Sequence, residues 1–327
     1  MVEIKRDGTF DALKFLLICL VIVGHAIEPT RYINEASGIL YSVIYSFHMP
    51  LFVLLSGYFS KKQNLGKINK QAVSLVETYL VMAVVIGFVL GVGFRMVVLP
   101  SLSCWYLLSL ICWRYMLYFL VEVLKFNENK VLISSILIMV VFFCLPIRKY
   151  LGVFSIIRIS QFFFFFSVGY CIKASFVSKL HTERKLKIGL CLGALLCMVF
   201  ICAFSSRELH VLEFHRDTLF SLIDQFPFTP LIAAVYKFTL ILVSLIISFA
   251  ILTIKCLPGF FEKYGKHTLF FFFLQGILVH KFVLILPQNL IVELLFSFFV
   301  ILLGVLLCNR IPWILTPVSS FIKFLKK

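Results

Sequence analysis

The chain has 327 residues, of which 61% are hydrophobic and only 14% are charged, and its mean hydropathy is +1.05. So few charges cannot cover a soluble globule with polar surface, which excludes a soluble protein and predicts one that crosses a membrane several times. The formal charge of +16 does not predict a nucleic-acid partner, because membrane topology and attraction to anionic lipid explain it. We expect membrane lipid, and no nucleic acid, among its partners, while the oligomeric state stays unknown.

Ten apolar stretches follow one another along the chain, and a bilayer requires about 17 to 25 apolar residues per span. We therefore predict ten transmembrane helices, at residues 12-28, 38-59, 73-94, 104-124, 131-146, 151-172, 188-204, 230-254, 268-286 and 289-308. No polar block is long enough to fold alone. The expected architecture is one all-α integral membrane domain over residues 1–327, with no appended soluble domain.

Positive charge is shared unevenly between the two sets of connections. Lysine and arginine concentrate in the cytoplasmic loops of membrane proteins. With the N-terminus inside, twenty of the 31 basic residues fall in cytoplasmic segments and seven in external ones. Both termini are therefore predicted to be cytoplasmic. The longest external connection, Ser205 to Thr229, carries mixed charges and is either a solvated loop or part of an outward-facing site.

The first apolar stretch contains a cation, Lys14, and an imidazole, His25. Both project from one helix face, about 16 Å apart along the axis, because eleven residues make almost a whole number of turns. Asp11 is spaced to pair with Lys14, and Glu28 is spaced to hydrogen-bond His25. Ionisable groups are costly inside a membrane, so we interpret these residues as functional, with His25 as a general base oriented by Glu28.

The second stretch contains Phe47-His48-Met49-Pro50, followed by Ser56-Gly57. A proline in a helix interior removes one backbone hydrogen bond, so a carbonyl group is expected to be left free near His48. The small pair Ser56-Gly57 allows a neighbouring helix to approach closely. His48 is catalytic, ligand-binding or structural, and the sequence does not choose between these roles.

Four basic residues remain at membrane depth once the connections are assigned: Lys14, Arg114, Arg158 and Lys237. The carboxylates, by contrast, stand near the ends of the predicted helices. The interior is thus richer in cations than in partners for them, which predicts an anionic ligand. The ten cysteines show no CxxC or Cys/His spacing, so no metal is expected.

These stretches resemble the membrane-bound acyltransferase-3 family, which includes sugar O-acetyltransferases such as fucose O-acetylase-like proteins. The blocks that carry the resemblance occur in a similar order: Phe10-Asp11-Ala12-Leu13-Lys14 with Val23-Gly24-His25, Phe47-His48-Met49-Pro50-Leu51-Phe52 with Leu55-Ser56-Gly57-Tyr58, Trp105-Tyr106-Leu107, Arg158 with Phe165-Phe166-Ser167-Val168-Gly169-Tyr170, and Gly265-Lys266-His267-Thr268-Leu269. Lys14 stands where many members have arginine. Gln275 stands where a histidine is common, and His280 falls five residues too late to replace it.

The resemblance implies transfer of an acyl group, usually acetyl, from a cytoplasmic coenzyme A thioester to a hydroxyl of a sugar or a lipid-linked glycan. Acetyl-CoA, the acyl donor, would be the anion that the cation-rich interior predicts, and no metal is implied. The implied location is the cytoplasmic (inner) membrane of a bacterium. The candidate site residues are His25, Glu28 and His48 for catalysis, Lys14, Asp11, Arg158 and Arg114 for the donor, and Trp105 and Tyr106 for the substrate.

A second class of protein is a transporter or exporter of a glycan or an acyl species, in which buried His25 and Lys14 form a proton relay. Two features of the sequence disfavour it. The second half of the chain does not echo the first, and the two halves lack paired helices broken by Gly or Pro at corresponding positions. Label that moves from acetyl-CoA into polysaccharide would distinguish the enzyme from the transporter.

Overall fold

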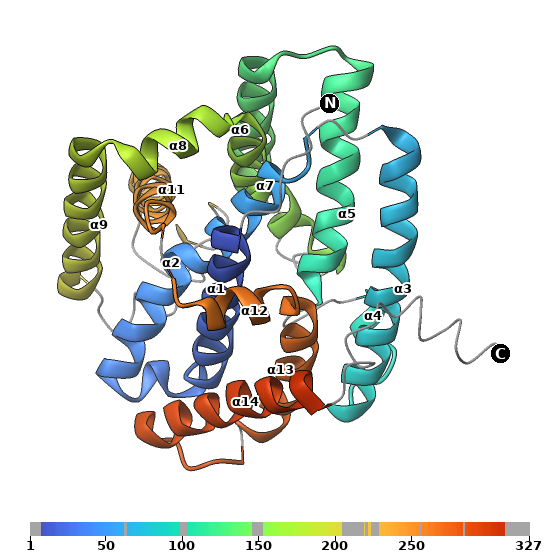
Figure 1. The fold of residues 1–327 in the computed structure, drawn as a ribbon, viewed down its shortest axis with the longest axis vertical. Helices are drawn as coiled ribbons and strands as arrows, with labels where there is room; N and C mark the ends of the chain where they lie inside the picture. Colours follow the sequence, from blue (N-terminus) through green and yellow to red (C-terminus); the bar gives the residue numbers. More distant parts are fainter. Residues whose placement is uncertain are drawn as a thin grey trace. The chain divides into compact units, whose positions relative to one another are not determined.

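The structure, a computed structural model, describes residues 8–61, 64–98, 104–145, 153–204, 229–255, 257–283 and 285–310, together with residues 219, 222 and 223. Every regular element in these residues is a helix, as Figure 1 shows. The all-α prediction is therefore confirmed for this part of the chain. The predicted connection from Ser205 to Thr229 lies almost wholly outside the described residues.

Seven helices in the described ranges are long and apolar enough to cross a membrane, as expected of a multi-pass membrane protein. They are α1 (Gly8–Ala26), α2 (Glu35–Tyr58), α3 (Leu65–Val89), α5 (Trp105–Tyr118) continued by the π-helix η2 (Phe119–Val123), α9 (Arg184–Phe204), α11 (Pro230–Leu252) and α14 (Leu290–Arg310). Helices α7 (Ile156–Cys171) and α8 (Ala174–Thr182) make an eighth candidate if they count as one span bent by 82°.

Each of the ten predicted segments contains a helix. Eight of them contain the seven long helices and α7, and the other two contain α6 (Glu128–Cys144) and α13 (Thr268–Phe282). Helix α13 has only 15 residues, fewer than a span usually requires, so the number ten stays a prediction. Four further short helices do not coincide with a predicted span of their own: η1 (Pro29–Tyr32), α4 (Arg95–Val98), η4 (Val153–Ser155) and α12 (Gly259–Gly265).

The third predicted helix differs from the structure at both ends. It was expected at residues 73–94, but α3 runs from Leu65 to Val89. Its early end has a local reason. Gly91 and Gly93 follow it with φ angles of 74° and 56°. Glycine is the residue that adopts this left-handed conformation most readily, and it stops the helix here.

The described helices fall into two compact units, each treated separately below. Unit 1 comprises residues 1–44, 177–210 and 247–316, and unit 2 comprises residues 45–176, 211–246 and 317–327. This grouping by proximity does not test whether the chain is one domain, which stays a prediction.

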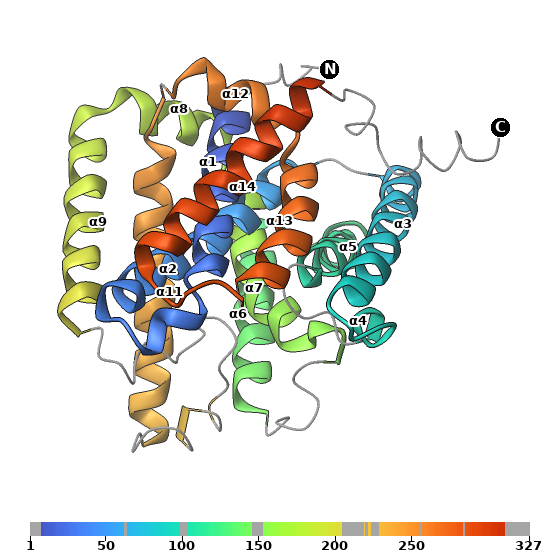
Figure 2. The ribbon, with the colours of Figure 1, turned by 90° about the horizontal axis from the view of Figure 1, so that it is seen from below.

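In unit 1, helix α1 packs against α12, α13 and α14, an arrangement visible in Figures 1 and 2. The buried ring of Phe15 lies 5.7 Å from Tyr264 on α12 and 5.2 Å from Phe271 on α13, measured between ring centroids. Helix α12 approaches so closely that a side chain at Gly265 would overlap the backbone carbonyl of Asp11. Aromatic packing and one glycine thus fix the helix that carries Lys14 and His25.

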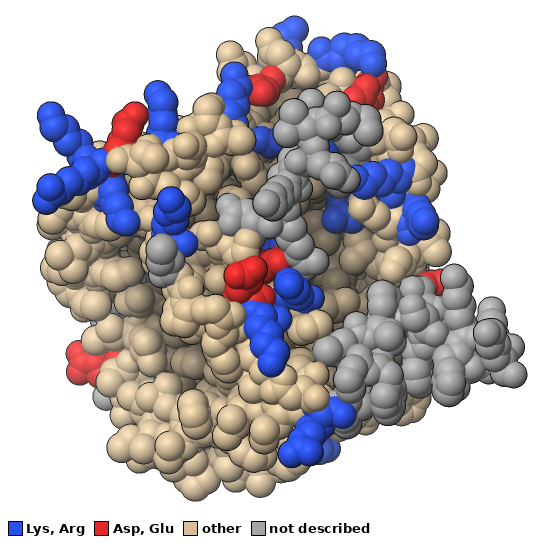
Figure 3. Space-filling model, in the orientation of Figure 1, with Lys and Arg blue, Asp and Glu red and all other residues tan. Residues whose placement is uncertain are grey.

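Helix α9, also in unit 1, has the distribution of charged and apolar side chains that is expected of a membrane-spanning helix. Its first turn carries the exposed Arg184, Lys185 and Lys187. In Figure 3, blue side chains of Lys and Arg gather over the α8 end of α9. The rest of its exposed face is apolar, with Leu196 69% exposed. A basic first turn followed by an exposed apolar face is typical of a helix that spans a bilayer and has a charged end outside it.

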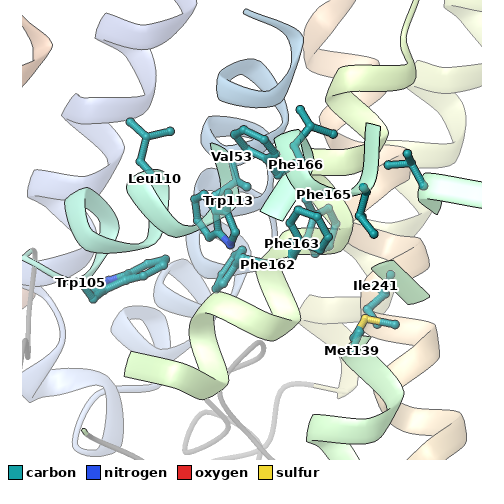
Figure 4. Close-up of a cluster of buried hydrophobic side chains, with 13 residues drawn as sticks. Val53, Trp105, Leu110, Trp113, Met139, Phe162, Phe163, Phe165, Phe166 and Ile241 are labelled. Atoms are coloured by element: carbon teal, nitrogen blue, oxygen red, sulfur yellow. The ribbon is translucent and has the colours of Figure 1, made fainter. Parts of the chain in front are cut away.

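Unit 2 has an aromatic core built on helices α5 and α7. The side chains of Trp113 and Phe162, Phe163, Phe165 and Phe166 are buried, and Figure 4 shows them pointing toward one another. The indole Nε1 of Trp113 donates a hydrogen bond of 2.7 Å to the carbonyl oxygen of Ile159. The phenylalanine run of α7 is therefore mainly packing surface.

Helices α2 and α7 meet through two glycines in unit 2. A side chain at Gly57 would overlap the carbonyl of Phe166, and one at Gly169 would overlap the carbonyl of Leu54. The expected close neighbour of the Ser56-Gly57 pair is thus α7. Small residues at such a contact let two backbones approach within van der Waals distance.

The carbonyl group that loses its usual backbone donor because of Pro50 also lies in unit 2. Residue 50 would normally donate its backbone N–H to the carbonyl of Ser46, four residues earlier, but proline has no N–H to donate. The hydroxyl of Ser244 on α11 donates to that oxygen at 2.5 Å instead. The carbonyl near His48 lacks its usual backbone donor, as Pro50 predicts, but it is not left free, because a second helix supplies a hydroxyl donor.

Candidate active site

His25 lies in the last turn of α1 and is held by a carboxylate. Its Nδ1 is 3.3 Å from Oε2 of Glu28, as the spacing of three residues predicts. The His25 side chain is 16% exposed, so the ring is largely shielded from solvent. The contact through Nδ1 fixes the orientation of the imidazole ring relative to Glu28.

Glu28 is held in turn by an arginine that the sequence had placed only in a loop. Nη1 of Arg31 donates to Oε1 of Glu28 at 3.3 Å. The guanidinium carbon of Arg31 lies 4.6 Å from the ring centroid of Tyr32 and 4.5 Å from that of Tyr41. The two rings restrict Arg31 in position, and Arg31 restricts Glu28.

The ionisation of Glu28 follows from these contacts. Burial alone would raise the pKa of Glu28, but the hydrogen bond with His25 and the positive charge of Arg31 hold this pKa at about 2. Glu28 is consequently a carboxylate at any physiological pH. A fixed carboxylate orients the imidazole and favours its protonated form once it has taken a proton.

Two further residues of unit 1 complete this end of α1. The ring of His280, in the last turn of α13, lies 5.0 Å from the ring of His25 at an interplanar angle of 65°. The hydroxyl of Thr30 donates to Oε2 of Glu293, at the start of α14, at 2.6 Å. Helices α13 and α14 therefore both contribute polar groups around His25 and η1.

Lys14 and Asp11 form the second predicted pair on α1. Nζ of Lys14 lies 3.3 Å from Oδ1 of Asp11, and the lysine side chain is 28% exposed. The pair leaves the ammonium-bearing side chain of Lys14 partly accessible. Both local pairs predicted from the sequence are thus present in unit 1.

In unit 2, Arg158 and the aromatic pair of α5 lie together. The guanidinium carbon of Arg158 is 5.3 Å from the ring centroid of Trp105. The hydroxyls of Tyr106 and Ser56 share a hydrogen bond of 2.6 Å. A cation over an indole ring offers both charge and an aromatic face to a ligand.

Arg114 borders a cavity of about 100 Å³ within unit 2. The cavity lies between α2, α3, α5, η2 and α7 and is lined by Ser60, Ile68, Arg114, Leu117, Tyr118, Val121, Glu122 and Tyr170. Among the described residues, the buried Nε of Arg114 has no hydrogen-bond partner. This guanidinium therefore retains a donor for an anion, and π-helices such as η2 are frequent at functional sites.

Two predicted groups have less direct support as ligands. His48 is buried and its ring lies 4.7 Å from the ring of Tyr45, a contact compatible with each of its three predicted roles. Lys237 is also buried, and its Nζ donates to Oε1 of Gln161 at 2.7 Å. This cation has a protein partner, so the count of cations without one is smaller than the sequence predicts.

The predicted site residues divide between the two units. Unit 1 brings together His25 and Glu28, and it also contains the pair formed by Lys14 and Asp11. The remaining candidates belong to unit 2: His48, Trp105, Tyr106, Arg114 and Arg158. In the described ranges, no group of three or more His, Cys, Asp or Glu side chains is arranged to hold a metal ion.

Sequence reasoning missed Arg31 and His280 as members of the site. Arg31 lies three residues beyond Glu28, so the spacing that identified Glu28 would have identified it too. His280 was set aside because it is displaced from the position where the family's histidine is common. Its contact with His25 joins two distant helices and leaves no local signal in the sequence.

Residues 7–310 match a family described as an acyltransferase domain. The match spans nearly the whole chain, so the protein belongs to the acyltransferase-3 family. This membership, together with the apolar helices, defines the class of protein as a multi-pass membrane acyltransferase.

Two relatives share a shorter region. The chain is 46% identical over 57 residues to the nodulation protein NolL of Sinorhizobium fredii, which is 16% of each chain. It is 42% identical over 72 residues to the nodulation protein NolL of Mesorhizobium japonicum, covering 21% of this chain and 19% of that protein. The matched region is thus under a fifth of the length of either relative. No solved structure matches the chain.

Proposed function

We propose that the protein transfers an acyl group, acetyl in the first instance, from a coenzyme A thioester to a hydroxyl of a cell-surface or lipid-linked glycan. The observation that carries this proposal is the chain of contacts from His25 to Glu28 to Arg31 in a member of an acyltransferase family. It is the arrangement that a hydroxyl nucleophile needs, since the hydroxyl must lose its proton to a base as it attacks.

The reaction proceeds at Nε2 of His25. This nitrogen takes the proton of the acceptor hydroxyl while the hydroxyl oxygen attacks the thioester carbonyl carbon. The new oxygen–carbon bond forms, the carbon–sulfur bond breaks, and the leaving thiolate of coenzyme A takes the proton from the imidazolium of His25, which regenerates the base. Glu28 holds the imidazole in the required tautomer and stabilises the imidazolium that results.

The donor is assigned to the basic residues of the membrane-embedded helices. In unit 1, Lys14 is assigned to the donor phosphates, and Asp11 orients it. In unit 2, considered separately, Arg158 and Arg114 are assigned to the donor because guanidinium groups suit phosphate, and Nε of Arg114 has no hydrogen-bond partner among the described residues. Lys14 and His25 share one face of α1 about 16 Å apart, so an extended thioester arm can run from the phosphates to the base. Trp105 and Tyr106 are assigned to the acceptor, because aromatic faces and hydroxyls suit a sugar ring.

The proposed setting is the cytoplasmic membrane of a bacterium, with both termini in the cytoplasm. Twenty of the 31 basic residues fall on the cytoplasmic side in this orientation. His25 then lies toward the outer half of the membrane and Lys14 toward the cytoplasm, where coenzyme A is available. The nodulation proteins match too small a part of the chain for their role to be assigned to this protein.

The envelope glycans of a strain that lacks the protein test this proposal. Mass spectrometry and NMR should show the loss of one class of O-acyl ester relative to the parent, restored by the wild-type chain. His25→Ala should not restore it although the protein is made and inserted. His181→Ala is the matched control. His181 hydrogen-bonds the carbonyl of Leu252 and is not a candidate site residue, so this variant should restore the ester. Full restoration by His25→Ala would overturn the assignment of the base.

A further inference from the structure

Glu293 is a buried carboxyl group that the proposed reaction does not use. It lies in the first turn of α14 and is only 1% exposed. It makes no ion pair with any residue in the described part of the chain. Burying an ionisable group without an ion pair costs free energy, so a protein that retains one is expected to use it. Within unit 1, the side chain of Glu293 engages Thr30.

This contact joins α14 to η1. Oγ1 of Thr30 donates to Oε2 of Glu293 at 2.6 Å, and Thr30 is fully buried. The same hydroxyl lies 3.1 Å from the carbonyl oxygen of Ile27. A hydroxyl has one proton to donate, so the shorter contact, to Glu293, is the stronger of the two. The contact is therefore a link between two segments that are 263 residues apart in the sequence.

Backbone hydrogen bonds hold both ends of this link. The carbonyl of Thr30 accepts from the N–H groups of Ile33 and Asn34, at 3.0 and 2.9 Å, on the far side of η1. The N–H of Glu293 donates to the carbonyl of Asn289 at 3.0 Å, where α14 begins. The link therefore sets the position of the η1 backbone on α14, because neither end can move without breaking backbone bonds.

The segment that is held in this way carries the groups that orient the proposed base. Arg31 follows Thr30 directly, and Glu28 comes immediately before η1. Nη1 of Arg31 donates to Oε1 of Glu28, and Oε2 of Glu28 lies 3.3 Å from Nδ1 of His25. A shift of η1 would therefore turn the carboxylate relative to the imidazole. A misplacement of about 1 Å at a reacting group can lower a rate about 10²-fold.

We propose that Glu293 is a positioning residue for acyl transfer. Through Thr30 it holds η1 in the place where Glu28 and Arg31 orient His25. The inference rests on the function proposed above, in which His25 is the base. Glu293 takes no part in the making or breaking of bonds. Its side chain has only to accept a hydrogen bond, so its charge is not required.

Substitutions at both ends of the contact test this in purified protein assayed with labelled acetyl-CoA and glycan acceptor. Glu293→Gln keeps an acceptor and Thr30→Ser keeps a hydroxyl, so both should keep the wild-type kcat. Glu293→Leu and Thr30→Val remove these groups and should lower kcat about 10- to 100-fold, with KM for acetyl-CoA unchanged. Ser297→Ala, which removes a buried hydroxyl one turn further along α14, is the matched control and should keep the wild-type kcat.

The double variant with Thr30→Val and Glu293→Leu separates positioning from folding. Thr30→Val alone leaves a buried carboxyl group without its partner and destabilises the protein, whereas replacing both partners with apolar side chains of similar shape is nearly neutral. The double variant should therefore unfold in detergent at the wild-type temperature and still show the lowered kcat. In a Glu28→Gln background, Glu293→Leu should lower kcat no further, because the carboxylate that it positions is gone.

Three results would overturn the positioning role. The first is a wild-type kcat in Glu293→Leu. The second is a double variant that has both the stability and the kcat of wild type, as expected of a contact that only supports the fold. The third is an equal loss of kcat from Glu293→Leu with and without Glu28→Gln. Failure of the proposed function is a different outcome, since wild-type protein would then move no label from acetyl-CoA.

Discussion

At the scale of single residues, the local pairs on α1 follow from the sequence and the distant partner of His25 does not. Spacing of three residues places Asp11 beside Lys14 and Glu28 beside His25, and the structure has both pairs. His280 reaches His25 from another helix, so its contact depends on packing that hydropathy does not encode. Periodicity therefore identified the proposed base and its orienter, and left its neighbour unrecognised.

Arg31 sets the acid tolerance of the site through Glu28. The folded-state pKa of Glu28 is held at about 2, below its ordinary value of 4.5, so the stability that ionised Glu28 contributes is present above pH 4.5 and is lost as pH falls toward 2. Arg31→Gln removes a positive charge and raises this pKa, so the folded protein should lose this stability at a higher pH than wild type. The unfolding temperature in detergent, measured between about pH 2 and 7, checks this. Arg95→Gln, at an exposed site on α4, is the control and should follow the wild-type pH dependence. Identical pH dependence for Arg31→Gln and wild type would show that Arg31 does not act on Glu28.

Substitutions of Lys14 test the proposed donor site. An ammonium is a point charge and cannot make the bidentate phosphate contact of a guanidinium. Lys14→Ala should raise the apparent KM for acetyl-CoA about 10-fold with the KM for acceptor unchanged, and Lys14→Arg should lower the acetyl-CoA value. Steady-state kinetics with each substrate varied in turn checks both. Lys187→Ala, exposed on α9, should change neither value. An unchanged donor KM in Lys14→Ala would remove Lys14 from the donor site.

At the scale of helices, hydropathy locates the elements well and their ends less well. Every predicted span contains a helix. A long apolar run indicates a segment buried in lipid, and such a segment forms a helix. The ends depend on single residues, as Gly91 and Gly93 show by stopping α3 early. The short helices α8 and α12 were missed, since neither is long enough to span a bilayer.

The glycine contact between α2 and α7 should be sensitive to one methyl group. Gly57→Ala and Gly169→Ala each place a Cβ on a backbone carbonyl of the other helix, which must move. We expect each to lower the free energy of unfolding by about 1–3 kcal/mol, as overpacking does. Gly189→Ala on α9 meets no atom within 4 Å and should be neutral or stabilising. Unfolding in detergent compares the three, and equal stability for all of them would disprove close packing of α2 on α7.

The proline of α2 and the serine of α11 should be coupled. Ser244→Ala deprives the Ser46 carbonyl of its donor and should destabilise the protein by about 1–2 kcal/mol. Adding Pro50→Ala supplies a backbone N–H to the same oxygen and should recover most of that loss. Ser248→Ala is the control, because that hydroxyl has no partner among the described residues. Strictly additive effects of the two substitutions, measured in a double-mutant cycle, would contradict the shared carbonyl.

At the scale of the whole molecule, composition and charge define a multi-pass protein, and the family match defines an acyltransferase. Neither specifies the acceptor. The sequence places the proposed base, His25, and one proposed donor cation, Lys14, on one face of α1, while His48, Trp105, Tyr106, Arg114 and Arg158 belong to the helices of unit 2. What composition could not predict is which of the buried cations already has a protein partner, as Lys237 does.

The most direct test follows the acyl group itself. Purified protein in proteoliposomes is given acetyl-CoA labelled in the acetyl group, with envelope glycan as acceptor, and the label in glycan is counted. Wild type should transfer label, and His25→Ala should transfer it about 10²- to 10⁴-fold more slowly while unfolding at the same temperature as wild type. Undiminished transfer by His25→Ala, or movement of glycan across the membrane without label, would contradict acyl transfer by this base.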